Sequence, residues 1–135
     1  MKFALSIMLV MASMTGNAKA QSGGTSVEQK LSVPIPNISG KSLKTMIVTY
    51  APGASSRSHR HAPSAFIYAQ VIEGEIRSQV DGGSPEVYKV GDFWTENPGA
   101  HHQISENASS TKPARMLVVF IVDTADKTLT SADPK

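Results

Sequence analysis

The stretch AFIYAQVIEGEIRSQVDGG, residues 65–83, decides the fold. It is rich in β-branched and aromatic residues, breaks at Glu73-Gly74 and closes at Asp81-Gly82-Gly83. Residues of this kind favour strands, and Asp-Gly favours the positive φ angles of a hairpin turn. The stretch therefore predicts a strand, a break, a second strand and a hairpin turn.

Further short strands are predicted on both sides of this stretch. They lie at residues 43–50, 87–90, 93–95, 102–105 and 116–122, with Gly- and Pro-containing turns between them. Helical periodicity is absent, and many short strands at close spacing indicate an all-β sandwich or barrel. Closing the sheet removes exposed edges, so the length suits a jelly-roll β-barrel.

The N-terminus has the pattern of a signal peptide. Lys2 precedes an apolar run that stops before residues 15–17, well short of the roughly 20 residues that a membrane span needs. Ala18-Lys19-Ala20 places small residues where a signal peptidase reads, so cleavage is expected after Ala20. The mature chain is then a secreted or periplasmic protein, with no later segment able to span a membrane.

The mature chain is expected to form one domain. Residues 21–40 are predicted to contain a leader and a first edge strand, and the Gly/Ser-rich residues 21–25 are expected to be disordered. Residues 41–125 form the folded β-barrel domain, and the polar residues 126–135 a flexible C-terminal tail.

Charge and cysteine content exclude some functions. The chain has 13 Lys and Arg against 11 Asp and Glu, and removal of Lys2 and Lys19 leaves 11 against 11. Nucleic acid is therefore not expected as a partner, because binding to its backbone requires clustered basic residues. The chain has no cysteine, so any metal ion must be held by nitrogen and oxygen ligands.

The four histidines occur as two close pairs, His59-Arg60-His61 and His101-His102. Side chains alternate between the two faces of a strand, so His59 and His61 point the same way and Arg60 points opposite. His101 and His102 cannot both face inward. Two histidines on one face with a third from a partner strand make a plausible metal site, because neutral imidazole is a common metal ligand.

The residues around both pairs resemble the cupin superfamily, in particular its small single-domain, quercetinase-like members. The first cupin motif is G-x5-H-x-H-x(3,4)-E-x6-G. Gly53, His59 and His61 match its first half, and residues 71–75 look like its usual ending. The motif glutamate is missing, since counting back from Gly74 places it at Ile67 and counting forward places it at residue 65 or 66.

The second cupin motif, G-x5-P-x-G-x2-H-x3-N, is also recognisable. Gly91 opens it, the proline of Asn97-Pro98-Gly99 is shifted by one place, and the spacing selects His102 over His101. Asn107 lies one residue beyond the position expected for the motif asparagine. The resemblance covers about residues 45–122 and implies a double-stranded β-helix, a metal bound by His59, His61 and His102, a small-molecule substrate or ligand, and a homodimer. The implied cofactor is a divalent transition metal: Fe, Mn, Ni, Cu or Zn.

Glu96 is the first candidate to replace the missing glutamate. Cupins usually carry barrel-facing apolar residues at positions equivalent to Trp94 and Glu96, and a buried unpaired carboxylate is costly. Glu96 therefore coordinates the metal, acts as acid or base beside it, or escapes to solvent at the following turn. Gln70 is the second candidate ligand, if a bulge shifts its strand, and it is also a candidate for the substrate pocket. The alternative is that Gln70 faces outward.

Three other residues are candidates for the substrate pocket. Trp94, the only tryptophan, is expected to wall an apolar pocket or to belong to the core. Arg57 shares the face of His59 and His61 and could anchor an anionic substrate. His101 is expected to face away from the metal, where it either orients His102 or substrate through a hydrogen bond or is a surface residue.

Two functions follow from these residues. The first is a dioxygenase-type oxidoreductase that acts on a small organic substrate, with Glu96 as the catalytic proton acceptor. The second is a non-catalytic barrel that binds a sugar or another small ligand, since a fold does not settle function.

Overall fold

The computed structural model describes residues 20–135, apart from the side chains of residues 20–22. The predicted signal peptide lies outside the described residues, except for Ala20. The described part contains eleven strands: β1 (Ala20–Ser22), β2 (Thr25–Pro34), β3 (Lys41–Tyr50), β4 (His59–His61), β5 (Phe66–Glu73), β6 (Glu75–Val80), β7 (Glu86–Lys89), β8 (Phe93–Glu96), β9 (His101–Asn107), β10 (Ala114–Asp123) and β11 (Thr130–Ala132).

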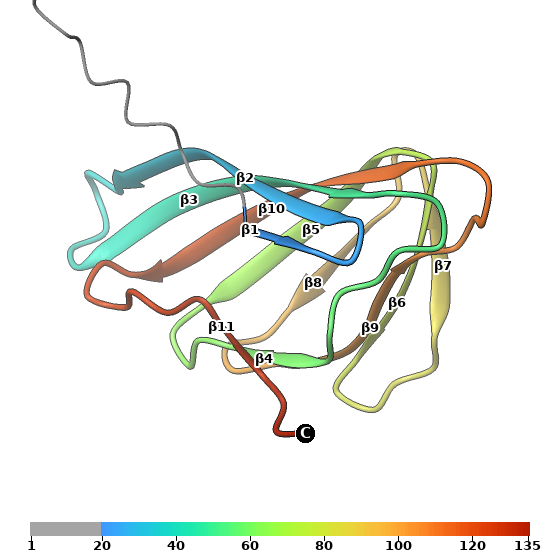
Figure 1. Ribbon diagram of the computed structural model, residues 1–135. Helices are drawn as coiled ribbons and strands as arrows, with labels where there is room; N and C mark the ends of the chain where they lie inside the picture. The colour runs from blue at the N-terminus through green and yellow to red at the C-terminus, as the bar shows by residue number, and fades with distance from the viewer. Residues whose placement is uncertain (1–19) are drawn as a thin grey trace, which may run out of the picture.

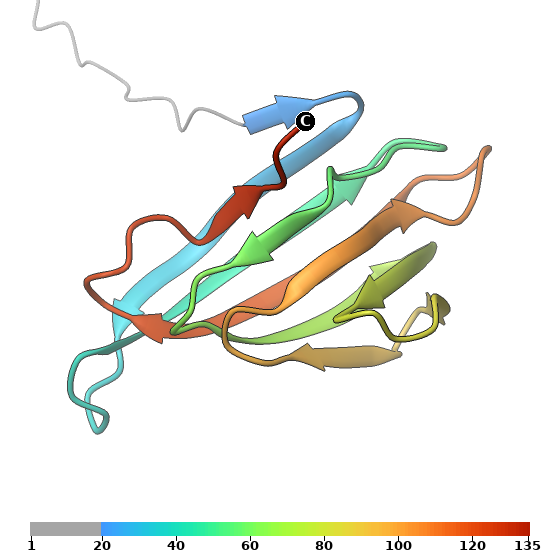
Figure 2. The same ribbon diagram turned by 90° about the horizontal axis from the view of Figure 1, so that it is seen from below.

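The strands form two sheets that face each other (Figure 1). The larger sheet has the order β1-β2-β3-β10-β5-β8, and the smaller has the order β11-β4-β9-β6-β7. Neighbouring strands in both sheets are antiparallel. Figure 2, viewed from below, shows β11, β4 and β9 of the smaller sheet lying across the larger one. The all-β class and the jelly-roll arrangement predicted from the sequence are confirmed.

The core lies between the sheets and follows from the alternation of side chains along each strand. In β10 every second residue, from Ala114 to Val122, is buried, and the residues between them are only partly buried. In β5 the buried set is Ile67, Ala69 and Val71. Alternate residues thus point into one shared interior, as expected for a strand with one face on the core.

The break predicted at Glu73-Gly74 is the point where the chain passes from the larger sheet to the smaller one. Gly74 has a φ of +68°, and a Cβ built there would lie 2.4 Å from the carbonyl oxygen of Pro113. Only glycine fits this corner, since both the backbone angle and the space exclude a side chain. The predicted hairpin turn is also confirmed, because β6 pairs with β7 and Asp81 and Gly82 have positive φ angles.

Two expectations about the chain ends are wrong. Residues 21–25 are not a disordered leader, because Gln21 and Ser22 belong to β1, which pairs with β2, and Thr25 is buried in β2. Residues 126–135 are not a loose tail, because β11 pairs with β4. Backbone hydrogen bonds hold both segments in place. These bonds form whether the side chains are polar or apolar, so the polar sequence of the segments did not predict them.

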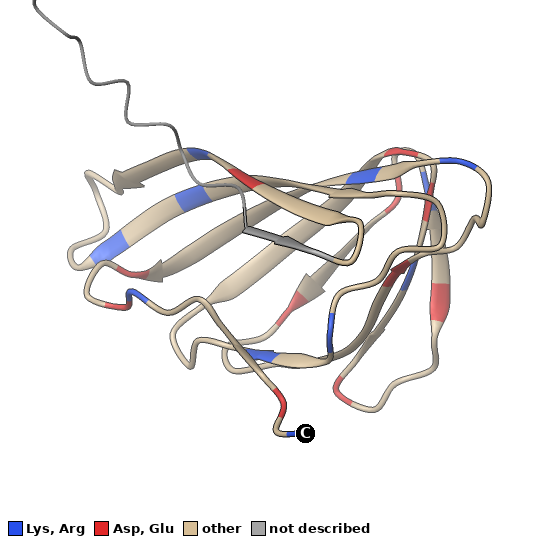
Figure 3. Ribbon diagram, viewed as in Figure 1, with Lys and Arg blue, Asp and Glu red and all other residues tan. Residues whose placement is uncertain are grey.

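Charged residues of both signs are spread over the two sheets (Figure 3). Within residues 20–135, no helix is long and apolar enough to cross a membrane.

Candidate metal centre

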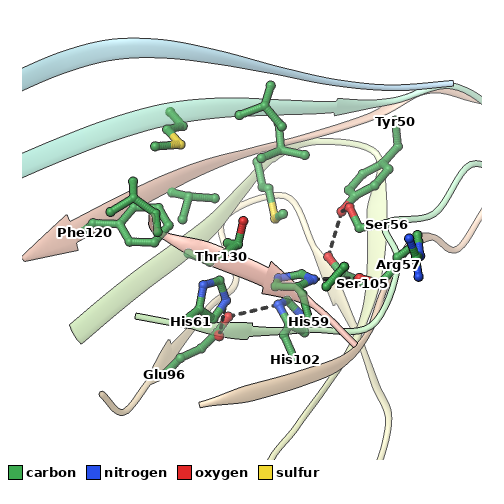
Figure 4. Close-up of a pocket in the computed structure, with 18 of the residues that line it drawn as sticks. Tyr50, Ser56, Arg57, His59, His61, Glu96, His102, Ser105, Phe120 and Thr130 are labelled. Carbon is green, nitrogen blue, oxygen red and sulfur yellow. Dashed lines mark hydrogen bonds and ion pairs between the residues drawn. The ribbon is translucent and has the colours of Figure 1, made fainter. Parts of the chain in front are cut away.

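Three histidines meet on the inner side of the smaller sheet. His59 and His61 lie on the same face of β4, while Arg60 between them is exposed, as alternation predicts. β9 pairs with β4 so that His102 stands opposite His59. The candidate ligand atoms of His59, His61 and His102 all lie within 4.8 Å of one another. Figure 4 shows the three rings gathered at one side of a cavity.

Hydrogen bonds orient two of these rings. Nδ1 of His59 donates to the carbonyl oxygen of Arg57 at 2.7 Å, which leaves Nε2 with its lone pair free. Nε2 of His102 lies 2.9 Å from the hydroxyl of Ser78, which leaves Nδ1 on the side of Glu96. Such outer hydrogen bonds set the ring orientation and tautomer of metal-binding histidines.

Glu96 enters this cluster from the larger sheet. It lies on β8, directly opposite Ile67 of β5, and is 2% exposed. Its Oε2 is 2.9 Å from Nε2 of His61, and its Oε1 is 3.3 Å from Nδ1 of His102 and accepts a 3.0 Å hydrogen bond from Nε1 of Trp94. The carboxylate that is absent at the Ile67 position thus has a counterpart directly across from it, on the neighbouring strand.

The cluster leaves buried polar atoms without partners. Although His61 Nε2 and Glu96 Oε2 are close, their alignment is not that of a hydrogen bond, and both atoms and His61 Nδ1 are unsatisfied. An unpaired buried polar atom costs about 1–3 kcal/mol. A cation bound between the histidines and the carboxylate would satisfy such atoms, and an all-nitrogen-and-oxygen set suits a divalent transition metal. The residues present therefore fit the metal expected from the sequence.

The protonation states also suit a cation. Burial lowers the pKa of His102 to about 4, and burial lowers the pKa of His59 as well. Burial by itself would raise the pKa of Glu96, but the contacts with His61, His102 and Trp94 outweigh it and hold that pKa below its usual value. At neutral pH the site thus offers neutral imidazole rings at His59 and His102 and an ionised carboxylate.

The predicted pocket residues fall into two groups. Trp94 and Arg57 line the same cavity as the histidines and Glu96, although Arg57 is exposed and donates from Nη2 to the carbonyl oxygen of Asp133 at 3.2 Å. The placement of Gln70 and His101 in the pocket is wrong. Gln70 donates to the carbonyl oxygen of Gly91 outside the cavity, because β5 keeps a regular register opposite β8.

His101 faces away from the metal centre, as expected, but it does not orient His102. Its Nε2 lies 2.7 Å from a carboxylate oxygen of Asp133 and 3.0 Å from the hydroxyl of Ser58. The ring therefore links β9 to the residue that follows β11. This role was not predicted, because Asp133 was expected to lie in a flexible tail.

Sequence reasoning also missed several polar residues around the cavity. Tyr50 is fully buried, and its hydroxyl lies 2.8 Å from that of Ser56 and 2.7 Å from that of Ser105. β11 adds Thr130 and Ala132 to the cavity wall. Ser78 could have been found, since a serine between Ile76 and Val80 on the inward face of β6 is a polar residue at a core position.

Comparisons with known proteins identify the family and the fold. The family model described as a cupin domain, Cupin_2, matches residues 46–120. Recombinant oxalate oxidase in complex with glycolate is similar at a TM-score of 0.62 and 26% identity over 76% of this chain and 53% of that one. The chain thus spans about half the length of oxalate oxidase. No curated protein matches the sequence.

Two less identical structures share the fold. KdgF from Halomonas sp. has a TM-score of 0.62 and 13% identity, over 82% of this chain and 90% of that one. The DMSP lyase DddQ from Ruegeria pomeroyi DSS-3 has a TM-score of 0.54 and 21% identity, over 67% of this chain and 42% of that one.

Proposed function

This chain belongs to the cupin family, and we propose that it is a dioxygenase-type oxidoreductase that binds a divalent transition metal and acts on a small organic substrate. His59, His61 and His102 would hold the metal, and Glu96 would be the fourth ligand or the proton acceptor beside it. The observation that carries the proposal is the buried Glu96 carboxylate, which lies among three histidines with its Oε2 unsatisfied. The similarity to oxalate oxidase supports an oxidoreductase.

The residues around this site have separate roles in orienting the metal ligands and in accepting a proton. When bound, the metal would supply a Lewis acid and, for Fe, Mn, Ni or Cu, a redox centre. Arg57 and Ser78 fix the orientation of two histidines, and Trp94 holds Oε1 of Glu96. Glu96, kept ionised, is placed to accept a proton from a substrate hydroxyl, provided that this hydroxyl lies within hydrogen-bond distance.

The metal content of purified protein tests the proposal. We expect about one Fe, Mn, Ni or Cu ion per chain by elemental analysis, and a loss of that ion in His61→Ala. The matched control is His101→Ala, which removes a histidine that faces away from the cluster and should leave the metal content unchanged. Folded wild-type protein that neither contains metal nor binds any of these ions on titration would contradict the proposal.

The alternative is a non-catalytic barrel that binds a small ligand. Stoichiometric zinc without any redox metal would be compatible with it, and oxygen consumption dependent on metal and on a small organic substrate would exclude it.

We further propose that the protein is exported and cleaved after Ala20. Mass spectrometry of the protein from fractionated cells would then give a chain that begins at Gln21 and lies outside the cytoplasm.

A further inference from the structure

The cavity beside the metal centre has one polar end and a long apolar wall. Its volume is about 370 Å³, the space of about a dozen water molecules. The inner face of the larger sheet forms the wall with Met46, Val48, Met116, Val118 and Phe120. Phe120, labelled in Figure 4, is the part of this wall nearest the metal centre, since its ring centroid lies 5.8 Å from that of His61. A ligand that reaches the metal must therefore place the rest of its atoms against hydrocarbon.

The polar groups that line the cavity outside the metal centre carry almost no charge. Tyr50, Ser56 and Ser105 are hydroxyls joined to one another, and burial raises the pKa of Tyr50, which keeps it neutral. Arg57 is the one Lys or Arg among the described lining residues. It is exposed, and its Nη2 contacts the carbonyl oxygen of Asp133. A second anionic group on a ligand would find no buried cation to pair with.

The charge of the metal centre sets the charge of the ligand it can hold. Imidazole binds a metal ion as a neutral ligand, so a divalent ion held by the histidines and the Glu96 carboxylate carries one net positive charge. A single anionic oxygen would balance this charge, whereas a dianion would leave an uncompensated negative charge in a buried site, which is costly.

We propose that the substrate is a small, mostly apolar monoanion, with one acidic oxygen at the His59–His61–Glu96–His102 end and a hydrocarbon body against Met46, Val48, Met116, Val118 and Phe120. This inference rests on the proposed function, because it needs a cation at the metal centre. It separates this site from one built for a small dicarboxylate, which would need a second buried positive group.

Calorimetric titration of zinc-loaded protein tests the inference, since zinc undergoes no redox change and the probes are not consumed. The probes are benzoate, acetate and malonate: an apolar monoanion, a small monoanion and a small dianion. Benzoate is expected to bind at least about tenfold more tightly than acetate or malonate, because its ring buries apolar surface. The fluorescence of Trp94, the only tryptophan and a cavity residue, should change on benzoate binding.

A matched pair of variants tests the apolar wall. Met46→Gln places an amide of similar length in the cavity and should weaken benzoate binding at least about threefold, with acetate binding unchanged. Ile47→Gln makes a comparable change at the next residue of β3, which does not line the cavity, and should leave both affinities as in the wild type.

The outcomes distinguish this inference from the proposed function. If zinc binds stoichiometrically but malonate or acetate binds as tightly as benzoate, the inference is overturned and the metal site stands. If zinc itself does not bind, the proposed function fails at the first titration, before any probe is added. An equal loss of benzoate affinity in Met46→Gln and Ile47→Gln would also overturn the inference.

Discussion

Glu96 occupies a core position in β8, between the exposed residues Thr95 and Asn97. A carboxylate at such a position is kept only if its surroundings compensate for the loss of water. His61, His102 and Trp94 provide that compensation, and the closest contact, to His61, is not a well-aligned hydrogen bond. This geometry is better suited to a cation shared between the two side chains than to a closed ion pair.

Glu96→Gln is predicted to weaken metal binding on the order of 10–100-fold, because it removes the only negative charge from the cluster and keeps the shape of the side chain. Affinity is measured by competition with a chelator of known strength. Glu73→Gln, at an exposed position of β5, is the matched control and should bind metal as the wild type does. Wild-type metal affinity and activity in Glu96→Gln would remove Glu96 from both of its proposed roles.

Among the elements, the corner between β5 and β6 brings the two sheets into position. At Gly74 the chain leaves the sheet that carries Glu96 and enters the sheet that carries the histidines. Its positive φ and the nearby carbonyl oxygen of Pro113 make Gly74 the most constrained glycine of the described residues.

Gly74→Ala is predicted to lower the free energy of unfolding by about 3 kcal/mol or more, since the new Cβ meets rigid backbone as well as an unfavourable φ. Gly40→Ala shares the positive φ, but no atom lies within 4 Å of its Cβ position, so a cost of only about 1 kcal/mol is expected. Urea unfolding of both variants gives the difference. Equal costs would mean that the contact with Pro113 does not constrain the corner.

β11 is the element that completes the cavity. Thr130 and Ala132 stand opposite His61 and His59 in the pairing with β4. Beyond the strand, the Asp133 carboxylate accepts a 2.6 Å hydrogen bond from Ser58 and lies 2.7 Å from His101. Asp133 thereby ties the end of β11 to Ser58, just before β4, and to His101 in β9. β4 and β9 are the two strands that carry the histidines.

Asp133→Ala is predicted to increase amide hydrogen exchange across residues 128–135 several-fold, with little change in exchange elsewhere, because the loss is confined to the contacts that hold β11. Mass spectrometry of peptides from exchanged protein measures this. Ser131→Ala, at an exposed position within β11, is the control and should exchange as the wild type does. Unchanged exchange in Asp133→Ala would show that backbone pairing alone holds the strand.

At the scale of the whole molecule, the buried histidines link stability to pH. The unfolded chain binds a proton at His102 below about pH 6.5, whereas the folded chain does so only below about pH 4. Between these values the unfolded state holds more protons, so stability falls as the pH falls. The lowered pKa values of His59 and Glu96 act in the same direction.

Metal-free protein is therefore predicted to lose up to about 3 kcal/mol of unfolding free energy through His102 between pH 6.5 and 4. Urea unfolding at a series of pH values measures the slope. His102→Gln should have a clearly shallower slope, even though its stability at neutral pH also differs. A constant unfolding free energy between pH 7 and 4.5 would contradict the prediction.

We also propose that the protein is a homodimer, as its resemblance to cupins implies. Sedimentation of the mature chain is expected to give twice the mass of one chain across the micromolar range. A single species with the mass of one chain would contradict it.

The local pattern of the sequence determines much of this protein. The period-two alternation, the glycine at the sheet corner and the Asp-Gly turn predict β3 and the strands from β5 to β10, because side-chain direction and turn geometry depend on near neighbours. The same alternation separates His59 and His61 from Arg60, and motif spacing selects His102 over His101. The cupin family follows from residues that can be read along the chain.

Only the tertiary structure decides which strands become neighbours. The pairing of Ile67 with Glu96 places a carboxylate beside the histidines, and the pairing of β11 with β4 turns an expected tail into a cavity wall. Both pairings join residues far apart in the sequence, and all three residues of β11 are exposed and show no apolar alternation. Register between distant strands depends on the packing of the whole core, so it cannot be predicted from a local pattern of residues.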